Sequence, residues 1–284
     1  MIERKLMPGS QCLYLKIYTG LKTADVILEE AIQPLVQSFL DKGKILKWFF
    51  IRYNDPKPHL RIRLMLKENF YYSEALEKIN SILKPYMKSG EISNVVMDTY
   101  VRELERYGEN TIEDAETLFW LSSQYALYSL FFDDDEKIMI TLFYIDGILN
   151  ELHLTDQEKL EWVKSSNESF KYEFHADKKL NSQLDKKYRE FKPQFLEFIK
   201  AEGFSEAREL ILSNIQESRI LFQNILSHDK NGSLGMPLSV FFQSIFHMNI
   251  NRLFVSNQRL FEMVIYDYLV RYYKTLVYRS RLEM

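Results

Sequence analysis

The first hundred residues mix strand-like and helix-like patterns of apolar positions. Alternation of apolar and polar residues, as in "CLYLKIYT", indicates a strand with one buried face, whereas apolar residues every three or four positions indicate a helix. We expect strands at 12–19, 45–53, 59–66 and 91–103 and helices at 23–43 and 73–90. The resulting order, β-α-β-β-α-β, predicts a ferredoxin-like sheet region.

From about residue 111 onward, amphipathic helical segments follow one another with short polar breaks. These segments are 111–132, 135–151, 156–172, 184–201, 205–227, 237–254 and 256–281. The best loop candidates among the breaks are "FHADKKLNSQ" and "SHDKNGSLGMP". The fold class is therefore α+β. No long flexible linker divides the sheet region, 1–110, from the helical region, 111–284, so the two form either separate domains or one continuous domain.

Composition limits the function classes that need to be considered. The chain has 284 residues, of which 46% are hydrophobic, and these values are typical of a globular protein with a sizeable core. A net charge of -3 disfavours direct binding of nucleic acid or of an anionic membrane, so any cationic site must be local. Neither a signal peptide nor a membrane span is evident, which predicts a cytoplasmic protein. The single cysteine, Cys12, excludes an internal disulfide.

The strand expected at 59–66 carries three cationic or ionisable side chains on one face. Alternation places Leu60 and Ile62 on one side and His59, Arg61 and Arg63 on the other. Guanidinium groups bind carboxylates in a bidentate manner, so this row predicts an anion site. The alternative is a half-solvated sheet face with ordinary surface arginines.

A second charged cluster, "YVRELERYG", follows the last expected strand. If a helix begins here, Glu103 and Arg106 share a face at the i,i+3 spacing and form an ion pair that orients the arginine. Arg102 lies in the same run. The alternative is a solvated helix start without function.

A third candidate lies near the C-terminus, in "SIFHMNINRL". Helical spacing places Ser244, His247 and Asn251 on one stripe in apolar surroundings, where a histidine with a displaced pKa acts as a general acid or base. A hydrogen-bonded core histidine is the alternative. Since no P-loop, GxGxxG, HExxH or GxSxG motif is present, we expect no cofactor and no metal.

Together, these segments resemble a known protein family. "GSQCLYLKIYTG", "KWFFIRYNDPKPHLRIRL", "YVRELERYG" and "FHMNINRL", in this order, are similar to motifs of the glutamate-elimination domain at the C-terminal end of class I lantibiotic dehydratases. The same domain occurs as free-standing proteins in thiopeptide and related bacteriocin pathways. The matching motifs span residues 9–253.

The resemblance implies a lyase of lantibiotic or thiopeptide biosynthesis. In that family a glutamylation domain transfers glutamate from glutamyl-tRNA to Ser or Thr of a precursor peptide. The elimination domain then removes the glutamate, which leaves dehydroalanine or dehydrobutyrine. The implied partners are a ribosomally made precursor peptide, a separate glutamylation protein and a lanthionine cyclase. No cofactor is implied, and the oligomeric state is open, a homodimer included.

The resemblance also implies roles for individual residues. His247 handles a proton, and Arg61, Arg63 and Arg106 hold the glutamyl group and stabilise negative charge. Glu103 orients an arginine or acts as the competing base, although pairing with arginine weakens a glutamate as a base. Three further residues are expected at the substrate: His59, Arg102 and Asn251. His59 is also the natural structural donor beside the hairpin turn.

Two alternatives remain open at this point. Some free-standing relatives are pyridine synthases that join two dehydroalanines, and a non-catalytic member would bind the leader peptide, for instance by strand addition to a sheet edge. The intact set of arginines, with Glu103 and His247, favours elimination. One departure concerns "WLSSQYAL", where the family often carries an Asp-Ser pair and this chain has no aspartate.

Overall fold

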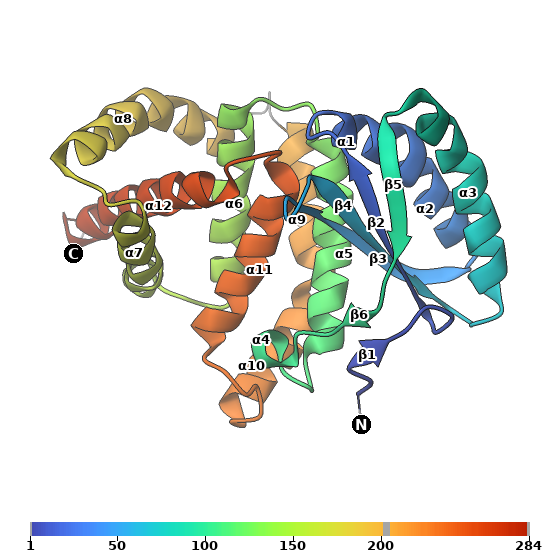
Figure 1. The fold of residues 1–284 in the computed structure, drawn as a ribbon. Helices are drawn as coiled ribbons and strands as arrows, with labels where there is room; N and C mark the ends of the chain where they lie inside the picture. The colour runs from blue at the N-terminus through green and yellow to red at the C-terminus, as the bar shows by residue number, and fades with distance from the viewer. Residues whose placement is uncertain (1, 201–204, 283–284) are drawn as a thin grey trace. The chain divides into compact units, whose positions relative to one another are not determined.

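The computed structural model describes residues 2–200 and 205–282 (Figure 1). The chain divides into two compact units, Met1–Leu130 with Ser227–Ser256 and Phe131–Leu226 with Asn257–Met284. The first unit thus contains helices α5 (Ile112–Tyr128) and α11 (Leu238–Leu253) together with the sheet. The predicted boundary near residue 110 assigned these two helices to the helical region instead. The difference arises because both helices contact the edge strand of that sheet.

A four-stranded antiparallel sheet forms the centre of the first unit (Figure 1). Its strands are β2 (Cys12–Thr19), β3 (Ile45–Tyr53), β4 (His59–Leu66) and β5 (Ile92–Met97). They lie side by side in the order β3-β4-β2-β5, so that the hairpin β3–β4 packs beside β2. The α+β fold class is confirmed, and β2, β3 and β4 have the predicted bounds.

Helices cover the apolar face of this sheet. They are α1 (Thr23–Val26), the π-helical segment η1 (Ile27–Ile32), α2 (Gln33–Asp41) and α3 (Tyr71–Ser89). The single helix predicted over 23–43 is therefore interrupted by a π-helical stretch in its middle. Helix α3 ends at Gly90, whose φ of 86° is the left-handed conformation that glycine adopts at helix ends.

The strand predicted over 91–103 is shorter than expected. Strand β5 ends at Met97, and β6 (Tyr100–Val101) pairs instead with β1 (Lys5–Leu6) in a separate two-stranded sheet. The break falls at Asp98, whose side-chain Oδ1 accepts a hydrogen bond of 2.7 Å from Thr99 N. Such local side-chain bonds compete with a strand ladder, so the chain turns here and enters α4 (Leu104–Tyr107).

The outer edge of β3 is covered by side chains of two helices. Ser123 Oγ of α5 accepts a hydrogen bond of 3.3 Å from Phe50 N. The side-chain amide of Asn251 on α11 bonds both backbone groups of Arg52, at 2.8 Å to the nitrogen and 2.9 Å to the oxygen. These contacts hold α5 and α11 against the sheet and satisfy backbone groups that an open edge would expose.

The second unit is helical in the part that the structure describes. Its helices are α6 (Asp134–Glu151), α7 (Asp156–Glu173), α8 (Lys178–Lys200), α9 (Ser205–Glu217) and α12 (Gln258–Leu282), and α10 (Arg219–Lys230) crosses the boundary between the units. Among the described helices, none is long and apolar enough to cross a membrane.

Two predicted segments of this region are corrected. Helix α8 begins at Lys178, inside the segment expected to be a loop, because Asp177 Oδ1 accepts a hydrogen bond from Leu180 N in the manner of an N-cap. The helix expected over 205–227 divides at Ser218, whose hydroxyl donates back to Asn214 O at 2.8 Å. Serine side chains that bond the preceding turn bend helices in this way.

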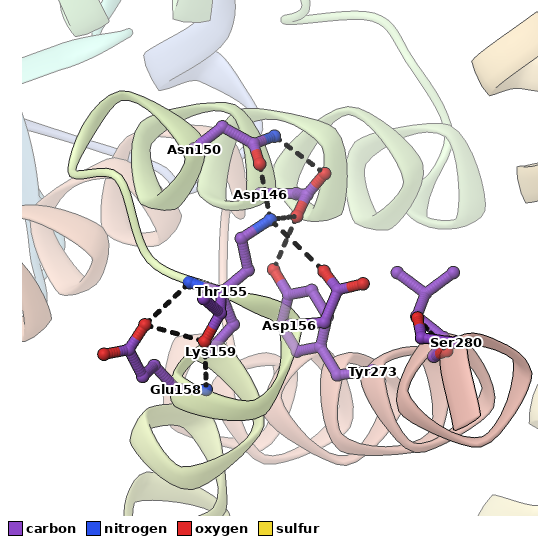
Figure 2. Close-up of polar contacts among 9 residues, drawn as sticks. Asp146, Asn150, Thr155, Asp156, Glu158, Lys159, Tyr273 and Ser280 are labelled. Atoms are coloured by element: carbon purple, nitrogen blue, oxygen red, sulfur yellow. Dashed lines mark hydrogen bonds and ion pairs between the residues drawn. The ribbon is translucent and has the colours of Figure 1, made fainter. Parts of the chain in front are cut away.

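A buried lysine joins three helices of the second unit (Figure 2). Lys159 of α7 is 3% exposed and donates to Asp146 Oδ1 at 2.9 Å and to Asn150 Oδ1 at 2.5 Å, both on α6. The Tyr273 hydroxyl of α12 donates to the same Asp146 oxygen at 2.8 Å. Burial and the Asp146 carboxylate raise the pKa of Tyr273 well above its usual value. Because the ammonium is paired inside the protein, this cluster is structural.

Candidate functional site

A cavity of about 460 Å³ opens on the polar face of the sheet in the first unit. Six of the eight predicted site residues line this cavity: Arg61, Arg63, Glu103, Arg106, His247 and Asn251. They come from β4, from the segment around α4 and from α11. Side chains from three distant stretches of sequence are thus brought together at one site.

Arg63 is a buried residue of the cavity lining, and aromatic rings surround its guanidinium. Strand register places Arg63 opposite Tyr14 on β2 and Phe49 on β3. Its guanidinium carbon lies 4.4 Å from the ring centroid of Tyr14, 5.4 Å from that of Phe49 and 4.7 Å from that of Tyr100. These cation–π contacts hold the guanidinium plane while its charge stays available.

Arg63 also lacks a polar partner among the residues that the structure describes. The residue is only 8% exposed, and its buried Nε makes no hydrogen bond there. A buried guanidinium without a carboxylate is costly, and an anion in the cavity would compensate for that cost. The arrangement therefore favours a negatively charged ligand that reaches Arg63.

Arg61 is held by stacking and by His59. Its guanidinium carbon lies 3.4 Å from the ring centroid of Tyr53, and its Nε donates to His59 Nε2 at 3.1 Å. His59 Nδ1 lies 2.8 Å from Lys57 O, a carbonyl that only accepts. The Nδ1 atom of His59 therefore carries the proton, and Nε2 is the acceptor for Arg61. His59 does not line the cavity itself but accepts a hydrogen bond from Arg61, which does.

We expect His59 to make the protein less stable in mild acid. Burial lowers the pKa of His59 below its usual value, so the unfolded chain binds a proton at a higher pH than the folded protein. The stability that neutral His59 contributes is present above its unfolded pKa of about 6.5 and is lost as the pH falls toward the folded pKa.

Urea unfolding of the wild type and of His59→Gln between pH 7.5 and pH 5 tests this expectation. The variant should show a flatter dependence of the free energy of unfolding on pH. His153→Asn, at an exposed position, is the matched control and should follow the wild type. Equal slopes for the wild type and His59→Gln would contradict the expectation.

The predicted ion pair at the start of α4 is confirmed. Arg106 Nε lies 3.8 Å from Glu103 Oε2, and both side chains line the cavity. Each side chain is about half exposed, at 53% for Arg106 and 56% for Glu103. Solvent weakens such a pair, so Arg106 can exchange Glu103 for another anion at little cost.

Arg102 has a different environment from the other predicted residues. It is buried, and its Nε and Nη2 bind the two oxygens of Glu116 at 2.8 and 2.9 Å. The Glu116 side chain is fully buried on α5, and Lys47 Nζ lies 3.5 Å from it. Arg102 does not line the cavity, and this bidentate pair joins the segment before α4 to α5.

Helix α11 supplies His247, Met248, Asn251 and Arg252 to the cavity, and the helix forms where it was predicted. Asn251 binds the backbone of β3 through its amide, so it fixes the helix. Arg252 is fully buried and donates to Ser123 Oγ at 3.0 Å and to Met248 O at 2.8 Å. His247 thus sits on a helix whose position is fixed by hydrogen bonds to β3 and α5.

Besides Arg252 on α11, two charged cavity residues were not predicted, Lys16 on β2 and Asp98 after β5. They form an ion pair with each other, and the hydrogen bond from Lys16 lowers the pKa of Asp98. The alternation in "CLYLKIYT" could have indicated Lys16, because it places this side chain on the face opposite to Leu13, Leu15 and Ile17. Its position opposite Arg61 depends on strand pairing, which the sequence alone did not specify.

The charges of the cavity lining are mainly positive. Five cationic residues line it, Lys16, Arg61, Arg63, Arg106 and Arg252, against the acidic residues Asp98 and Glu103. This balance favours an anionic ligand. Within the described part of the chain, no group of three His, Cys, Asp or Glu side chains is arranged to hold a metal ion.

Two curated proteins show the relationship at the level of sequence. The chain is 27% identical over 283 residues to the nisin biosynthesis protein NisB of Lactococcus lactis subsp. lactis, which covers 90% of this chain and 26% of that protein. It is 28% identical over 186 residues to the subtilin biosynthesis protein SpaB of Bacillus subtilis, covering 63% of this chain and 18% of that protein. The chain thus spans about a quarter of the length of NisB.

Solved structures show the same fold. The tRNA-dependent lantibiotic dehydratase MibB from Microbispora sp. 107891 matches with a TM-score of 0.71 at 18% identity, over 99% of this chain and 29% of that one. The pyridine synthase TbtD from thiomuracin biosynthesis matches with a TM-score of 0.60 at 10% identity, over 94% of this chain and 100% of that one. The family model described as lantibiotic biosynthesis dehydratase C-term matches residues 13–273. With the cavity and its arginines on that fold, this match shows that the chain belongs to the lantibiotic biosynthesis dehydratase C-terminal family.

Proposed function

We propose that this protein is a lyase that eliminates glutamate from glutamylated Ser or Thr residues of a precursor peptide and leaves dehydroalanine or dehydrobutyrine. The observation that carries the proposal is the buried, unpaired guanidinium of Arg63 in a cationic cavity that His247 also lines. A glutamyl ester brings its side-chain carboxylate into this cationic cavity, and the α-carboxylate that is released during elimination is the anion that the guanidinium of Arg63 can bind.

The reaction requires three contributions from the protein. A base removes the Cα proton of the modified residue, negative charge develops on the adjacent amide, and the bond from Cβ to the ester oxygen breaks as glutamate leaves. The electron pair of the C–H bond forms the new double bond, and the departing carboxylate takes the electrons of the broken bond. Fixed guanidinium groups stabilise both negative charges.

Arg61, Arg63 and Arg106 are the proposed anion-binding residues. Arg63 suits the innermost anion because it is buried and held between rings. Arg61 is oriented by Tyr53 and His59, and Arg106 becomes available when it leaves Glu103. His59 and Arg102 support this set from outside the cavity lining, and Asn251 supports it by fixing α11.

His247 is the proposed base. It lies on a helix that hydrogen bonds hold in place, and it lines the same cavity as the arginines. Glu103 is the competing candidate, but its carboxylate is already engaged by Arg106 in an ion pair. Glu103 is then the residue that holds Arg106 until substrate arrives.

The proposed partners are those that the elimination reaction requires. The substrate must first receive glutamate on Ser or Thr, and we assign that transfer to a separate glutamylation protein that acts before this one. The precursor peptide is the common substrate, and a lanthionine cyclase would use the dehydroamino acids. We place the reaction in the cytoplasm, where ribosomally made peptide and glutamyl-tRNA meet.

Incubation with a peptide that is already glutamylated on Ser or Thr tests the proposal. We expect mass spectrometry to show released glutamate and a peptide mass that corresponds to dehydrated residues. His247→Ala should lower kcat by about a hundredfold or more, whereas Glu103→Gln should have a smaller effect on kcat.

The outcomes separate the two candidate bases. If Glu103→Gln abolishes activity while His247→Ala retains it, the base assignment is reversed. An unchanged glutamylated cognate peptide with the wild-type protein contradicts elimination itself. Asp41→Asn, at an exposed position on α2 away from the cavity, is the control and should behave as the wild type.

Pyridine formation is the second candidate function. Its support is the match to TbtD, which covers 94% of this chain and 100% of that one. A cyclase that joins two dehydroalanines has no glutamyl group to bind, and the mainly cationic cavity lining therefore favours elimination. A peptide with two preformed dehydroalanines, incubated with the protein, would reveal a cyclised product if this candidate were correct.

A further inference from the structure

We propose that Lys16 and Asp98 form a subsite for a zwitterion and that this subsite, on the basis of the proposed function, selects the glutamyl group by its free ammonium and its side-chain carboxylate. An amino acid delivered from a tRNA ester is attached through its α-carboxyl group. A glutamyl ester therefore presents one ammonium and one carboxylate, which match Asp98 and Lys16 respectively.

The strand register places the pair beside the arginine row. Lys16 on β2 lies opposite Arg61 on β4, and on its other side it pairs with Val96 of β5. Asp98 follows directly after β5, at the point where the chain leaves the sheet. Both side chains line the same cavity as Arg63 and His247, so a ligand that reaches the arginines also reaches this pair.

The Asp98 carboxylate is fixed and ionised. One oxygen, Oδ1, accepts from Thr99 N at 2.7 Å, and the other, Oδ2, binds Lys16. The hydrogen bond from Lys16 lowers the pKa of Asp98, which keeps the carboxylate charged at neutral pH. Among the described residues, neither side chain has a second ion-pair partner.

The pair remains accessible to a ligand. Lys16 is 21% exposed and Asp98 is 42% exposed, so their ion pair is partly solvated and costs little to open. When a zwitterion enters, its ammonium replaces Lys16 at Asp98 and its carboxylate replaces Asp98 at Lys16. The number of ion pairs rises from one to two without an unpaired charge.

An acidic residue in this place also has an effect on specificity. A purely anionic ligand would be repelled by Asp98, and an uncharged side chain would leave Lys16 without a new partner. The subsite should therefore discriminate against a glutaryl ester, which lacks the ammonium, and against a glutaminyl ester, which lacks the carboxylate. A site built to bind a polar group rejects the analogue that lacks it, by about tenfold or more.

The test compares three synthetic peptides whose modified serine carries a glutamyl, a glutaryl or a glutaminyl ester. For the wild type we expect kcat/KM for glutamyl to exceed the other two by about tenfold or more. Asp98→Asn should reduce the preference of glutamyl over glutaryl, and Lys16→Gln should reduce the preference of glutamyl over glutaminyl. The ratios report recognition, because a general loss of folding lowers all three rates together.

The outcomes are separable from those of the proposed function. Equal rates for the three esters with the wild-type protein overturn the subsite, even if all three are eliminated, and this readout needs no variant. Unchanged ratios in both variants also overturn it. Absence of dehydroamino acids from every ester contradicts elimination instead. Asp41→Asn serves again as the control and should keep the wild-type ratios.

Discussion

Replacement of Arg63 by alanine is expected to abolish most elimination activity, with glutamylated peptide accumulating in place of the dehydrated product. Arg63 is the most buried of the proposed anion-binding residues, and rings of Tyr14, Phe49 and Tyr100 hold it. Loss of one fixed donor at a developing negative charge lowers kcat by about a hundredfold to a thousandfold. Single-turnover mass spectrometry on a preformed glutamylated peptide measures this change.

Arg63→Lys separates charge from geometry. An ammonium keeps the positive charge but neither stacks between rings nor donates in a bidentate manner, so we expect little recovery of activity. Arg189→Lys, on an exposed side chain of α8, is the matched control and should retain full activity. Wild-type rates in Arg63→Ala would contradict the assignment of this residue to the reaction.

Replacement of Arg102 by methionine is expected to have the largest effect on stability. The change leaves the carboxylate of Glu116, which is fully buried, without its bidentate partner. Breaking one side of a buried pair costs about 3–5 kcal/mol, and the lower end applies because Lys47 Nζ is still 3.5 Å from Glu116. Urea unfolding followed by circular dichroism gives the change in the free energy of unfolding.

A double variant identifies the cause. Arg102→Met combined with Glu116→Leu removes the fully buried carboxylate together with its bidentate partner, and Lys47 Nζ keeps its hydrogen bonds to Glu113 O and Thr117 Oγ1, so much of the lost stability should return. Arg219→Met is the matched control, because its ion pair with Glu151 is partly exposed to solvent, and it should lower the free energy of unfolding far less than Arg102→Met. If Arg102→Met unfolds at the wild-type urea concentration but loses substrate binding, the predicted substrate-binding role of Arg102 is favoured instead.

The arginine row was predictable because it depends only on local geometry. A strand turns alternate side chains to opposite faces, so "HLRIR" directs His59, Arg61 and Arg63 to one side whatever the rest of the chain does. The ion pair of Glu103 and Arg106 has the same origin, since helical spacing alone brings these residues within reach.

Residues whose role depends on distant partners were not predictable in this way. Lys16 and Asp98 meet only through the pairing of β2 with β5, and Arg102 meets Glu116 only when α5 packs beside the preceding segment. Arg102 therefore looked equivalent to Arg106 in the sequence, although one is buried against a carboxylate and the other lines the cavity. Charge patterns show which side chains are available, while tertiary pairing decides their partners.

The interruption of the first unit by residues 131–226 has a consequence for synthesis of the protein. Strands β2 to β5 leave the ribosome early, but His247 and Asn251 follow only after the whole intervening segment. Until α11 has been synthesised, the edge of β3 lacks the hydrogen bonds of the Asn251 amide, and the cavity that contains Arg63 is incomplete. Contacts of such long sequence separation form late, so a nascent chain has its anion-binding arginines before it has its proposed base.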